Sequence, residues 1–258
     1  MRPPTPLPEP TSTQGPLPLF AFCAGRTVMA SLAESYPTLL AALADHYGQP
    51  QFAPERRSAF EAVLAAALAR PADPARAEAA LEALDHSGLL EPMTLTGIEP
   101  SEILDSLRDT GLSLPARSAT LLVRLARWYS KAFGNEDLAR DPAARKLSGR
   151  REELAAINGV GLATADAILL AMGQPVYPLD RGTYRILVRH GWIDSATEYD
   201  QASELLSRQA DGNREEIARL STWLVQVGRQ FCVPRSPKCQ RCPLRCVLPD
   251  QGPLEPEV

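Results

Sequence analysis

Apolar residues recur at three- and four-residue intervals along most of this chain, between residues 28 and 231. That interval places them on one face of an α-helix, whereas a half-buried strand would alternate apolar and polar residues. No sustained alternation occurs, and glycines and prolines separate the periodic segments. The pattern therefore predicts an all-α fold. Helices are expected over residues 28–48, 56–70, 75–88, 99–111, 116–134, 150–157, 162–172, 179–191, 199–210 and 215–231.

The two ends of the chain lack core-forming patterns. Residues 1–26 include a tract rich in proline, serine and threonine, which predicts a disordered tail. Residues 251–258 are predicted to form a loose, polar C-terminus. Cys23 is expected to be a lone buried thiol. No run of residues is long enough to span a bilayer, so a cytoplasmic protein that contacts no membrane is expected.

Gly159 and Gly161 bracket one valine between two helical segments in the stretch INGVGLATA. A dinucleotide-binding glycine motif would follow a β-strand, but the preceding residues, GRREELAAI, favour a helix. Glycines let the chain turn tightly, and the N–H groups that open the second helix suit a phosphate. We therefore expect a helix–hairpin–helix that holds a phosphate group. Two core helices joined by a glycine turn fit these six residues alone equally well.

Four cysteines lie within fifteen residues near the C-terminus, at Cys232, Cys239, Cys242 and Cys246. Six, two and three residues separate them. Such closely spaced thiolates hold either a tetrahedral zinc ion or a cubane iron–sulfur cluster, and the intervals do not distinguish the two. Because this crowding suits a metal site in a reducing compartment better than a disulfide framework, we expect bound metal.

The formal net charge of −4 provides no overall attraction for nucleic acid, so any nucleic acid must bind to a local basic patch. Residues 229–246 contain five basic residues and no acidic one, so this segment is expected to neutralise phosphates. Lysine occurs only at positions 131, 146 and 238. That scarcity limits any chemistry that requires a primary amine.

Together, the hairpin, a downstream aspartate and the C-terminal cysteines resemble the endonuclease III family of DNA base-excision-repair glycosylases. The resemblance runs from about residue 52 to residue 246. It implies two helical domains that flank a DNA-binding cleft. One would be a helical barrel over residues 52–174 that contains the helix–hairpin–helix. The other would join residues 27–51 to residues 175–250 and carry an iron–sulfur cluster.

Compared with the family hairpin LPGVGRKTA, Asn158 stands where proline is usual, while Gly159, Val160 and Gly161 match. The position that holds a Schiff-base lysine in bifunctional members is Ala163. The stretch GLATADAILL is closest to the branch of the family that removes alkylated purines such as 3-methyladenine, which also lacks this lysine.

The segment PLDRGTYRI falls on the family sequence VDTHVxRV. By this match, Asp180 is the catalytic aspartate and Arg185 the later arginine, while Arg181 and Gly182 replace threonine and histidine. Arg70 stands where endonuclease III carries a glutamine that fills the gap left by the extruded base. The DNA-binding residues predicted on these grounds are Asn158, Gly159, Val160, Gly161, Arg70, Arg181, Arg185, Arg235, Lys238 and Arg241.

The family resemblance favours a 4Fe–4S cluster held by the four cysteines, with zinc as the alternative. The first two cysteine intervals match the family pattern. The third is usually five residues and is three here, so the loop that closes the site must differ from the usual one.

A glycosylase extrudes the target nucleotide from the helix to reach its N-glycosidic bond. Asp180 would stabilise the positive charge on the sugar and orient or deprotonate the attacking water. An aspartate before RGTYRIL also suits a helix N-cap. The lyase step needs a primary amine, which Ala163 lacks. We therefore predict a monofunctional glycosylase that leaves an abasic site in an intact strand.

Two alternatives remain open on the residues alone. One is a catalytically weak or inactive paralogue that binds DNA or abasic sites. The other is a bifunctional glycosylase and abasic-site lyase that uses another amine. The expected partner is double-stranded DNA containing a damaged base, and the protein is expected to be a monomer associated with the nucleoid.

Overall fold

The computed structural model describes residues 30–50, 58–69, 74–134, 147 and 149–254. All regular secondary structure within these residues is helical, which confirms the predicted all-α fold. The α-helices are α1 (Leu32–Tyr47), α2 (Ala59–Leu68), α3 (Pro74–His86), α4 (Pro92–Gly97), α5 (Pro100–Asp109), α6 (Ala116–Phe133), α7 (Arg150–Ala155), α8 (Leu162–Ala171), α9 (Arg181–Arg189), α10 (Tyr199–Gln209) and α11 (Arg214–Gln230). Two 3-10 helices follow, η4 (Cys239–Arg241) and η5 (Pro243–Val247).

Local sequence explains most of these boundaries. Ser31 and Glu34 form a capping box at the start of α1, and the Ser58 side chain accepts a hydrogen bond from the N–H of Glu61 at the start of α2. Gly134, with φ of +67°, ends α6. The sequence did not predict α4, because a helix of six residues is too short to show a helical period.

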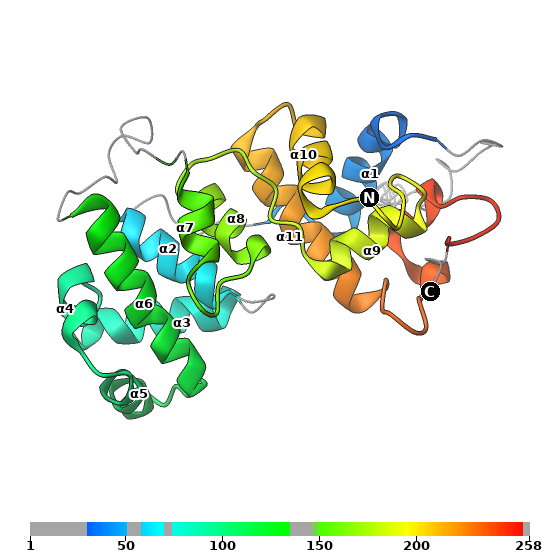
Figure 1. Ribbon diagram of the computed structural model, residues 1–258. Helices are drawn as coiled ribbons and strands as arrows, with labels where there is room; N and C mark the ends of the chain where they lie inside the picture. Colours follow the sequence, from blue (N-terminus) through cyan, green and yellow to red (C-terminus); the bar gives the residue numbers. More distant parts are fainter. Residues whose placement is uncertain (1–29, 51–57, 70–73, 135–146, 148, 255–258) are drawn as a thin grey trace, which may run out of the picture.

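Two hydrophobic cores lie side by side in the molecule (Figure 1). The first is built by α2 to α8 around fully buried side chains such as Leu122 and Ile168. The second is built by α1, α9, α10, α11 and η5 around Leu43 and Trp223. Figure 1 shows α2 to α7 in the left part of the molecule and α1 and α9 to α11 in the right part. The residue boundaries predicted for two domains remain a prediction, since a division into two cores does not by itself define domains.

Helix α8 connects the two cores. Its Ile168 belongs to the first core and its Leu170 to the second. The loop after α8 then leads to α9, which packs against α11 in the second core. The candidate site residues from position 180 onward therefore belong to the second core, whereas the glycine hairpin belongs to the first. Helix α8 and the loop that follows it set the position of these residues relative to the hairpin.

Some predictions fall on residues outside the described ranges. These are the tail of residues 1–26, Cys23, Arg70 and the last four residues of the chain. Among the described helices, none combines the length and the apolar character needed to cross a bilayer.

Candidate functional site

A tight turn joins α7 to α8 at the glycine pair. Gly159 has φ of +102°, a conformation that side-chain-bearing residues rarely adopt, and the N–H of Val160 donates to the carbonyl of Ile157 at 2.9 Å. The Val160 side chain is buried in the first core, whereas Asn158, Gly159 and Gly161 are exposed. The turn is thus anchored by one side chain and presents mainly backbone to solvent, as the helix–hairpin–helix prediction requires.

The first turn of α8 follows directly from this hairpin. Gly161 is the N-cap residue and provides no side-chain acceptor, and the first turn contains no acidic side chain. Leu162 is 41% exposed, and Ala163, at the position of the family lysine, is half-buried. No side chain of the helix therefore competes with an external anion for the N–H groups at this end. The phosphate contact itself stays a prediction.

Arg124 of α6 supports the hairpin from the side. Its Nη1 donates to the carbonyl of Asn158 at 2.8 Å, and the Leu121 side chain lies close to Gly159. Sequence reasoning missed Arg124, although a signal was available. Helix α6 contains four basic residues and no acidic one, and three of them are spaced by seven residues, a spacing that keeps them on one helix face. They are Arg117, Arg124 and Lys131, with Arg127 close to this row.

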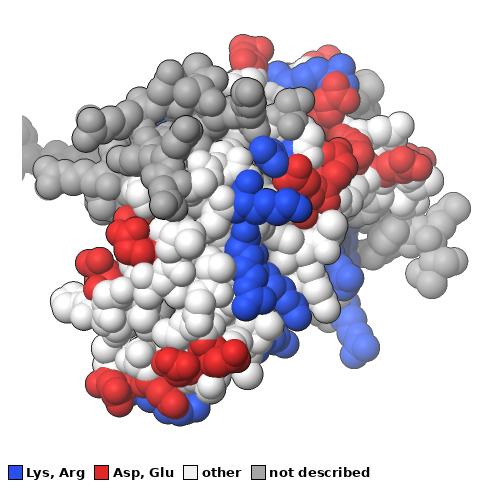
Figure 2. Space-filling view, turned by 60° about the vertical axis from the view of Figure 1, so that its left-hand side comes forward, with Lys and Arg blue, Asp and Glu red and all other residues white. Residues whose placement is uncertain are grey.

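Helix α6 therefore brings positive charge to the side of the hairpin. Arg117, Arg127 and Lys131 are exposed, and within the described residues α6's basic side chains form no ion pair. Figure 2 shows a stripe of Lys and Arg side chains running down one face of the molecule, with Asp and Glu on either side of it. On a protein of net negative charge, such a local stripe suits a phosphate backbone.

Asp180 begins α9 as its N-cap, which confirms the capping role expected from the sequence. Its Oδ1 accepts hydrogen bonds from the N–H groups of Gly182 at 2.5 Å and Thr183 at 3.1 Å. Its Oδ2 accepts one from the Thr183 hydroxyl at 2.7 Å. The side chain is half-buried, and these three donors hold the carboxylate in one orientation at the edge of the second core.

Gly182, which replaces a histidine of the family pattern, lies where two helices almost touch. A Cβ built on it would lie 2.8 Å from Oδ1 of Asp180 and 3.3 Å from the Cα of Gly228 in α11. A larger residue at position 182 would therefore displace either the Asp180 carboxylate or α11. The close packing of α9 against α11 therefore requires a glycine at position 182.

Two arginines follow Asp180 in the predicted DNA-binding set. Arg181 is exposed at the start of α9. Arg185 is half-buried, and its guanidinium donates to the carbonyls of Cys232 at 2.7 Å, Gly228 at 3.2 Å and Arg181 at 3.4 Å. These contacts tie α9 to α11 and to the cysteine loop. Arg185 therefore has a structural role in the fold, and its predicted contact with DNA remains a prediction.

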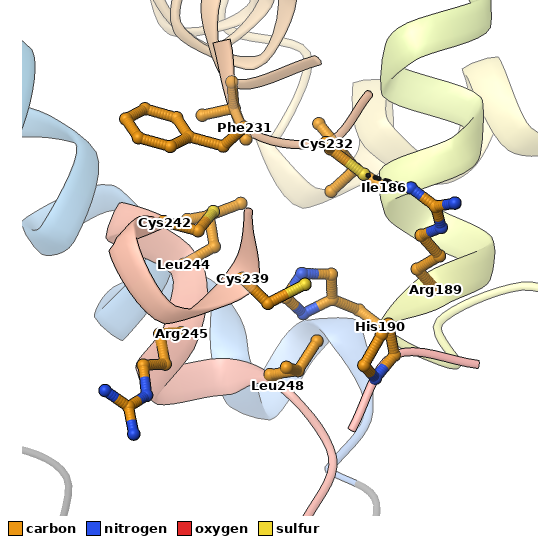
Figure 3. A pocket seen from close by; sticks show the side chains of 12 residues that line it. Ile186, Arg189, His190, Phe231, Cys232, Cys239, Cys242, Leu244, Arg245 and Leu248 are labelled. Carbon is orange, nitrogen blue, oxygen red and sulfur yellow. Dashed lines mark hydrogen bonds between the residues drawn. The ribbon is translucent and has the colours of Figure 1, made fainter. Parts of the chain in front are cut away.

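Three of the four cysteines line one pocket between α9, α11 and the C-terminal 3-10 helices. Cys232, Cys239 and Cys242 share it with His190, as Figure 3 shows. Cys246 lies on η5 close by, and its thiol donates to the carbonyl of Pro243 at 3.8 Å. All four are free thiols. The exposed Arg235, Lys238 and Arg241 lie on the same loop.

Burial perturbs the titratable groups that line this pocket. Burial raises the pKa of the Cys242 thiol to about 12; a hydrogen bond with the Leu244 backbone opposes this, and the charges of the neighbouring cysteines add to the rise. Several thiolates side by side need a positive partner, which a metal provides. Burial also lowers the pKa of His190 to about 4, so its ring is neutral at neutral pH.

Arg189 brings a buried positive charge to the edge of this pocket. The side chain is 2% exposed, and Nη1 lies 3.5 Å from the sulfur of Cys232. The same guanidinium donates to the carbonyls of Val233 and Pro234, both at 2.8 Å. The loop that follows Cys232 is thus held onto α9 through its backbone. Sequence reasoning did not identify Arg189, because nothing local distinguishes it from a surface arginine.

Proteins of known sequence resemble the chain over most of its length. A provisionally named DNA repair glycosylase of Methanocaldococcus jannaschii is 27% identical over 206 residues, which cover 79% of this chain and 90% of that protein. Endonuclease III of Sulfolobus acidocaldarius is 27% identical over 191 residues, which cover 73% of this chain and 81% of that protein. No protein-family profile matches the chain.

Solved structures share the arrangement of helices. Endonuclease III trapped in a covalent intermediate with DNA superposes with a TM-score of 0.59 over 84% of this chain and 95% of that one, at 21% identity. The chain is endonuclease III-like. A thermostable thymine-DNA glycosylase gives a TM-score of 0.53 over 80% of this chain and 91% of that one, at 18% identity. The arrangement of helices in this chain is thus the one that these solved structures have.

Proposed function

We propose that this endonuclease III-like chain is a DNA N-glycosylase of base-excision repair. It hydrolyses the bond between a damaged base, such as an alkylated purine, and its deoxyribose. The observation that carries the proposal is Asp180, a half-buried carboxylate held in one orientation by Gly182 and Thr183 at the start of α9. It stands at the position that the family resemblance assigns to catalysis.

In the proposed reaction, the damaged nucleotide is rotated out of the duplex and its C1′ approaches Asp180. The bond from C1′ to the base nitrogen breaks, and the electron pair leaves with the base. The carboxylate stabilises the positive charge that develops on the sugar. A water molecule then bonds to C1′ and passes its proton to the carboxylate. The product is an abasic site in an unbroken strand.

The absence of an amine at position 163 supports hydrolysis without strand cleavage. A lyase step requires a primary amine that attacks C1′, and the half-buried Ala163 has none. Of the lysines in the described residues, Lys131 lies in α6, seven residues beyond the Arg124 that contacts the hairpin, and Lys238 lies in the cysteine loop, so neither occupies the position of the family lysine.

DNA would be held by three surfaces with different chemistry. The hairpin offers backbone N–H groups around Gly161, α6 offers its row of arginines, and the cysteine loop offers Arg235, Lys238 and Arg241. All three suit phosphates, and none reads bases, which agrees with an enzyme that must accept a lesion in any sequence.

We also propose that the four cysteines hold a 4Fe–4S cluster in preference to zinc. A single zinc ion draws its sulfur ligands to about 2.3 Å from one point. Among the described residues, no three cysteine, histidine or acidic side chains converge closely enough to hold one ion. Cys232, Cys239 and Cys242 nevertheless line one pocket, and Cys246 lies close by on η5. When bound, the cluster would supply a rigid cross-link between α11 and the C-terminal loop.

Substitution of Asp180 by asparagine tests the catalytic role. Asparagine keeps an oxygen that caps α9, so the fold should survive, whereas the negative charge is lost. Wild-type protein should release free base from duplexes in a panel of alkylated, oxidised and mismatched substrates, and the Asp180→Asn protein should bind the same duplexes without releasing base. Base release by both proteins at equal rates would show that Asp180 is only a cap.

One observation favours a second candidate, a protein that binds DNA or abasic sites without turnover. Every polar atom of the Asp180 carboxylate already accepts a hydrogen bond from α9. If these bonds do not yield to substrate, the carboxylate acts only as a cap. In that case wild-type and Asp180→Asn proteins would bind abasic duplexes alike, and neither would release base from any substrate of the panel.

A further inference from the structure

A buried carboxylate that the proposed mechanism does not use lies on α8, seven residues after the start of the glycine hairpin. Asp166 has 0% exposure. Arg151 of α7 binds it in a bidentate manner, with Nε 2.7 Å from Oδ1 and Nη2 3.0 Å from Oδ2. The two helices on either side of the hairpin are therefore joined by an ion pair whose carboxylate is buried and whose guanidinium is partly exposed, and this pair restrains the angle at which the hairpin projects.

A residue of α10, a helix of the second core, also binds the Asp166 carboxylate. The hydroxyl of Tyr199, the first residue of α10, donates to Oδ2 of Asp166 at 2.7 Å. Nη2 of Arg151 also lies 2.7 Å from Oδ1 of Asp200, and its guanidinium lies over the Tyr199 ring, 5.4 Å from the centroid. Burial and the charge of Asp166 raise the pKa of Tyr199, so its hydroxyl stays a donor.

The Tyr199 hydroxyl also accepts a hydrogen bond, and this one leads to the proposed catalytic residue. The N–H of Leu179 donates to it at 3.2 Å, and Leu179 immediately precedes Asp180. Helix α10 holds the residue two positions earlier as well. The Ser203 hydroxyl donates to the carbonyl of Tyr177 at 2.7 Å, and the N–H of Tyr177 donates to the Ser207 hydroxyl at 3.0 Å.

A continuous path of hydrogen bonds thus runs from the hairpin helices to the backbone before Asp180. It passes from Arg151 to Asp166, then to the Tyr199 hydroxyl and to the N–H of Leu179. The hairpin stands on the first core and Asp180 on the second, so a link between them must cross from one core to the other. Because catalysis depends on placing the sugar within a fraction of an ångström of the carboxylate, the separation of these two parts matters.

We propose that Tyr199 and Asp166 are positioning residues that set the place of Asp180 relative to the glycine hairpin, where the DNA strand is anchored. This inference rests on the proposed function. Neither side chain touches substrate, since Asp166 is fully buried and the Tyr199 hydroxyl is occupied by protein groups on both sides. Their effect reaches the reaction through the backbone at Leu179.

The variant Tyr199→Phe tests this link, because phenylalanine keeps the ring under Arg151 and removes only the hydroxyl. Single-turnover base release should slow by between about tenfold and about a hundredfold, while the affinity for a duplex with an uncleavable abasic analogue stays within about twofold. Hydrogen exchange of the peptide that contains residues 177–181 should become faster.

Tyr184→Phe is the matched control. The Tyr184 hydroxyl also makes two hydrogen bonds, to the carbonyls of Ser195 and Thr197, both at 2.9 Å, and neither leads to Leu179. Its loss should lower the melting temperature as much as the loss of the Tyr199 hydroxyl, without slowing base release. Equal rates in wild type and Tyr199→Phe, or equal slowing in both variants, would overturn the inference alone. A wild-type protein that releases no base overturns the proposed function and this inference together.

Discussion

Gly182 in α9 and Gly228 in α11 are in direct backbone contact: a Cβ added to Gly228 would lie 2.9 Å from the Cα of Gly182. Two helices approach this closely only where neither has a side chain at the crossing point. The contact also determines the position of Asp180, because the N–H of Gly182 donates to its Oδ1. Close packing in the second core and the orientation of the proposed catalytic carboxylate are therefore linked.

Gly228→Ala should test that link. The added methyl group would meet backbone atoms, which cannot move aside as the end of a flexible side chain can, so we expect the free energy of unfolding to fall by about 1 to 3 kcal/mol. Base release should slow as well, because the first turn of α9 must shift. Gly97→Ala is the control, since a Cβ there meets nothing within 4 Å. Chemical denaturation of the two variants should separate them, and equal stabilities would contradict the packing argument.

The lack of a lysine at position 163 predicts the outcome of borohydride trapping. Incubation of wild-type protein with an abasic duplex and borohydride should give no covalent complex on a denaturing gel, because hydrolysis by water forms no Schiff base. A lysine-bearing endonuclease III treated in parallel should give one. Efficient trapping of this chain would mean that another amine acts, and the protein would then be bifunctional.

Removal of one thiol should show what the cysteine pocket holds. Cys232→Ser should abolish bound iron and the broad visible absorption of an iron–sulfur cluster, and should lower the melting temperature, because the link between α11 and the C-terminal loop is lost. Cys23→Ser, outside the cysteine loop, should keep both signals. Elemental analysis of the wild type decides between the metals: stoichiometric zinc without iron would contradict the cluster.

The α6 arginines predict how DNA binding depends on salt. Arg117→Ala should weaken binding to undamaged duplexes and reduce the slope of log K against log salt by about 1, as expected when one phosphate contact is removed. Arg108→Ala in α5 removes an arginine that is also exposed but pairs with Asp105, and it should leave the slope unchanged. Fluorescence anisotropy over a salt series measures both. If the two variants behave alike, the α6 row is a solvated helix face.

The helices were predictable because each one carries its own apolar period and its own end signals, as in α1 and α6. Helix α4 was not, because its six residues make too few turns to display a period. Among the candidate site residues, Asp180 could be identified as a helix cap from the residues that follow it. The row of basic residues on α6 is visible in the sequence, but the contact of Arg124 with the carbonyl of Asn158 joins positions 34 residues apart, so its partner is not.

The arginines of α9 show most clearly how the fold distinguishes residues that look alike in the sequence. From sequence, Arg181, Arg185 and Arg189 are basic residues at four-residue intervals on one helix, and Arg181 and Arg185 were both predicted to bind DNA. In the fold, Arg181 is exposed, Arg185 binds carbonyls of α9, α11 and the cysteine loop, and Arg189 is buried beside Cys232. Which of them meets solvent depends on the face that α9 turns toward α11, and Gly182 lies on that face in contact with Gly228.

By itself, the sequence determined the all-α class, the glycine turn, the spacing of four thiols and the lack of an amine at Ala163. These are properties of short stretches of chain, set by backbone sterics, helical period and the chemistry of single side chains. Only the tertiary structure decided that α6 supports the hairpin and that Tyr199 connects Asp166 to the backbone before Asp180. Those contacts join residues far apart in the chain, and they form because side chains of α8 belong to both hydrophobic cores.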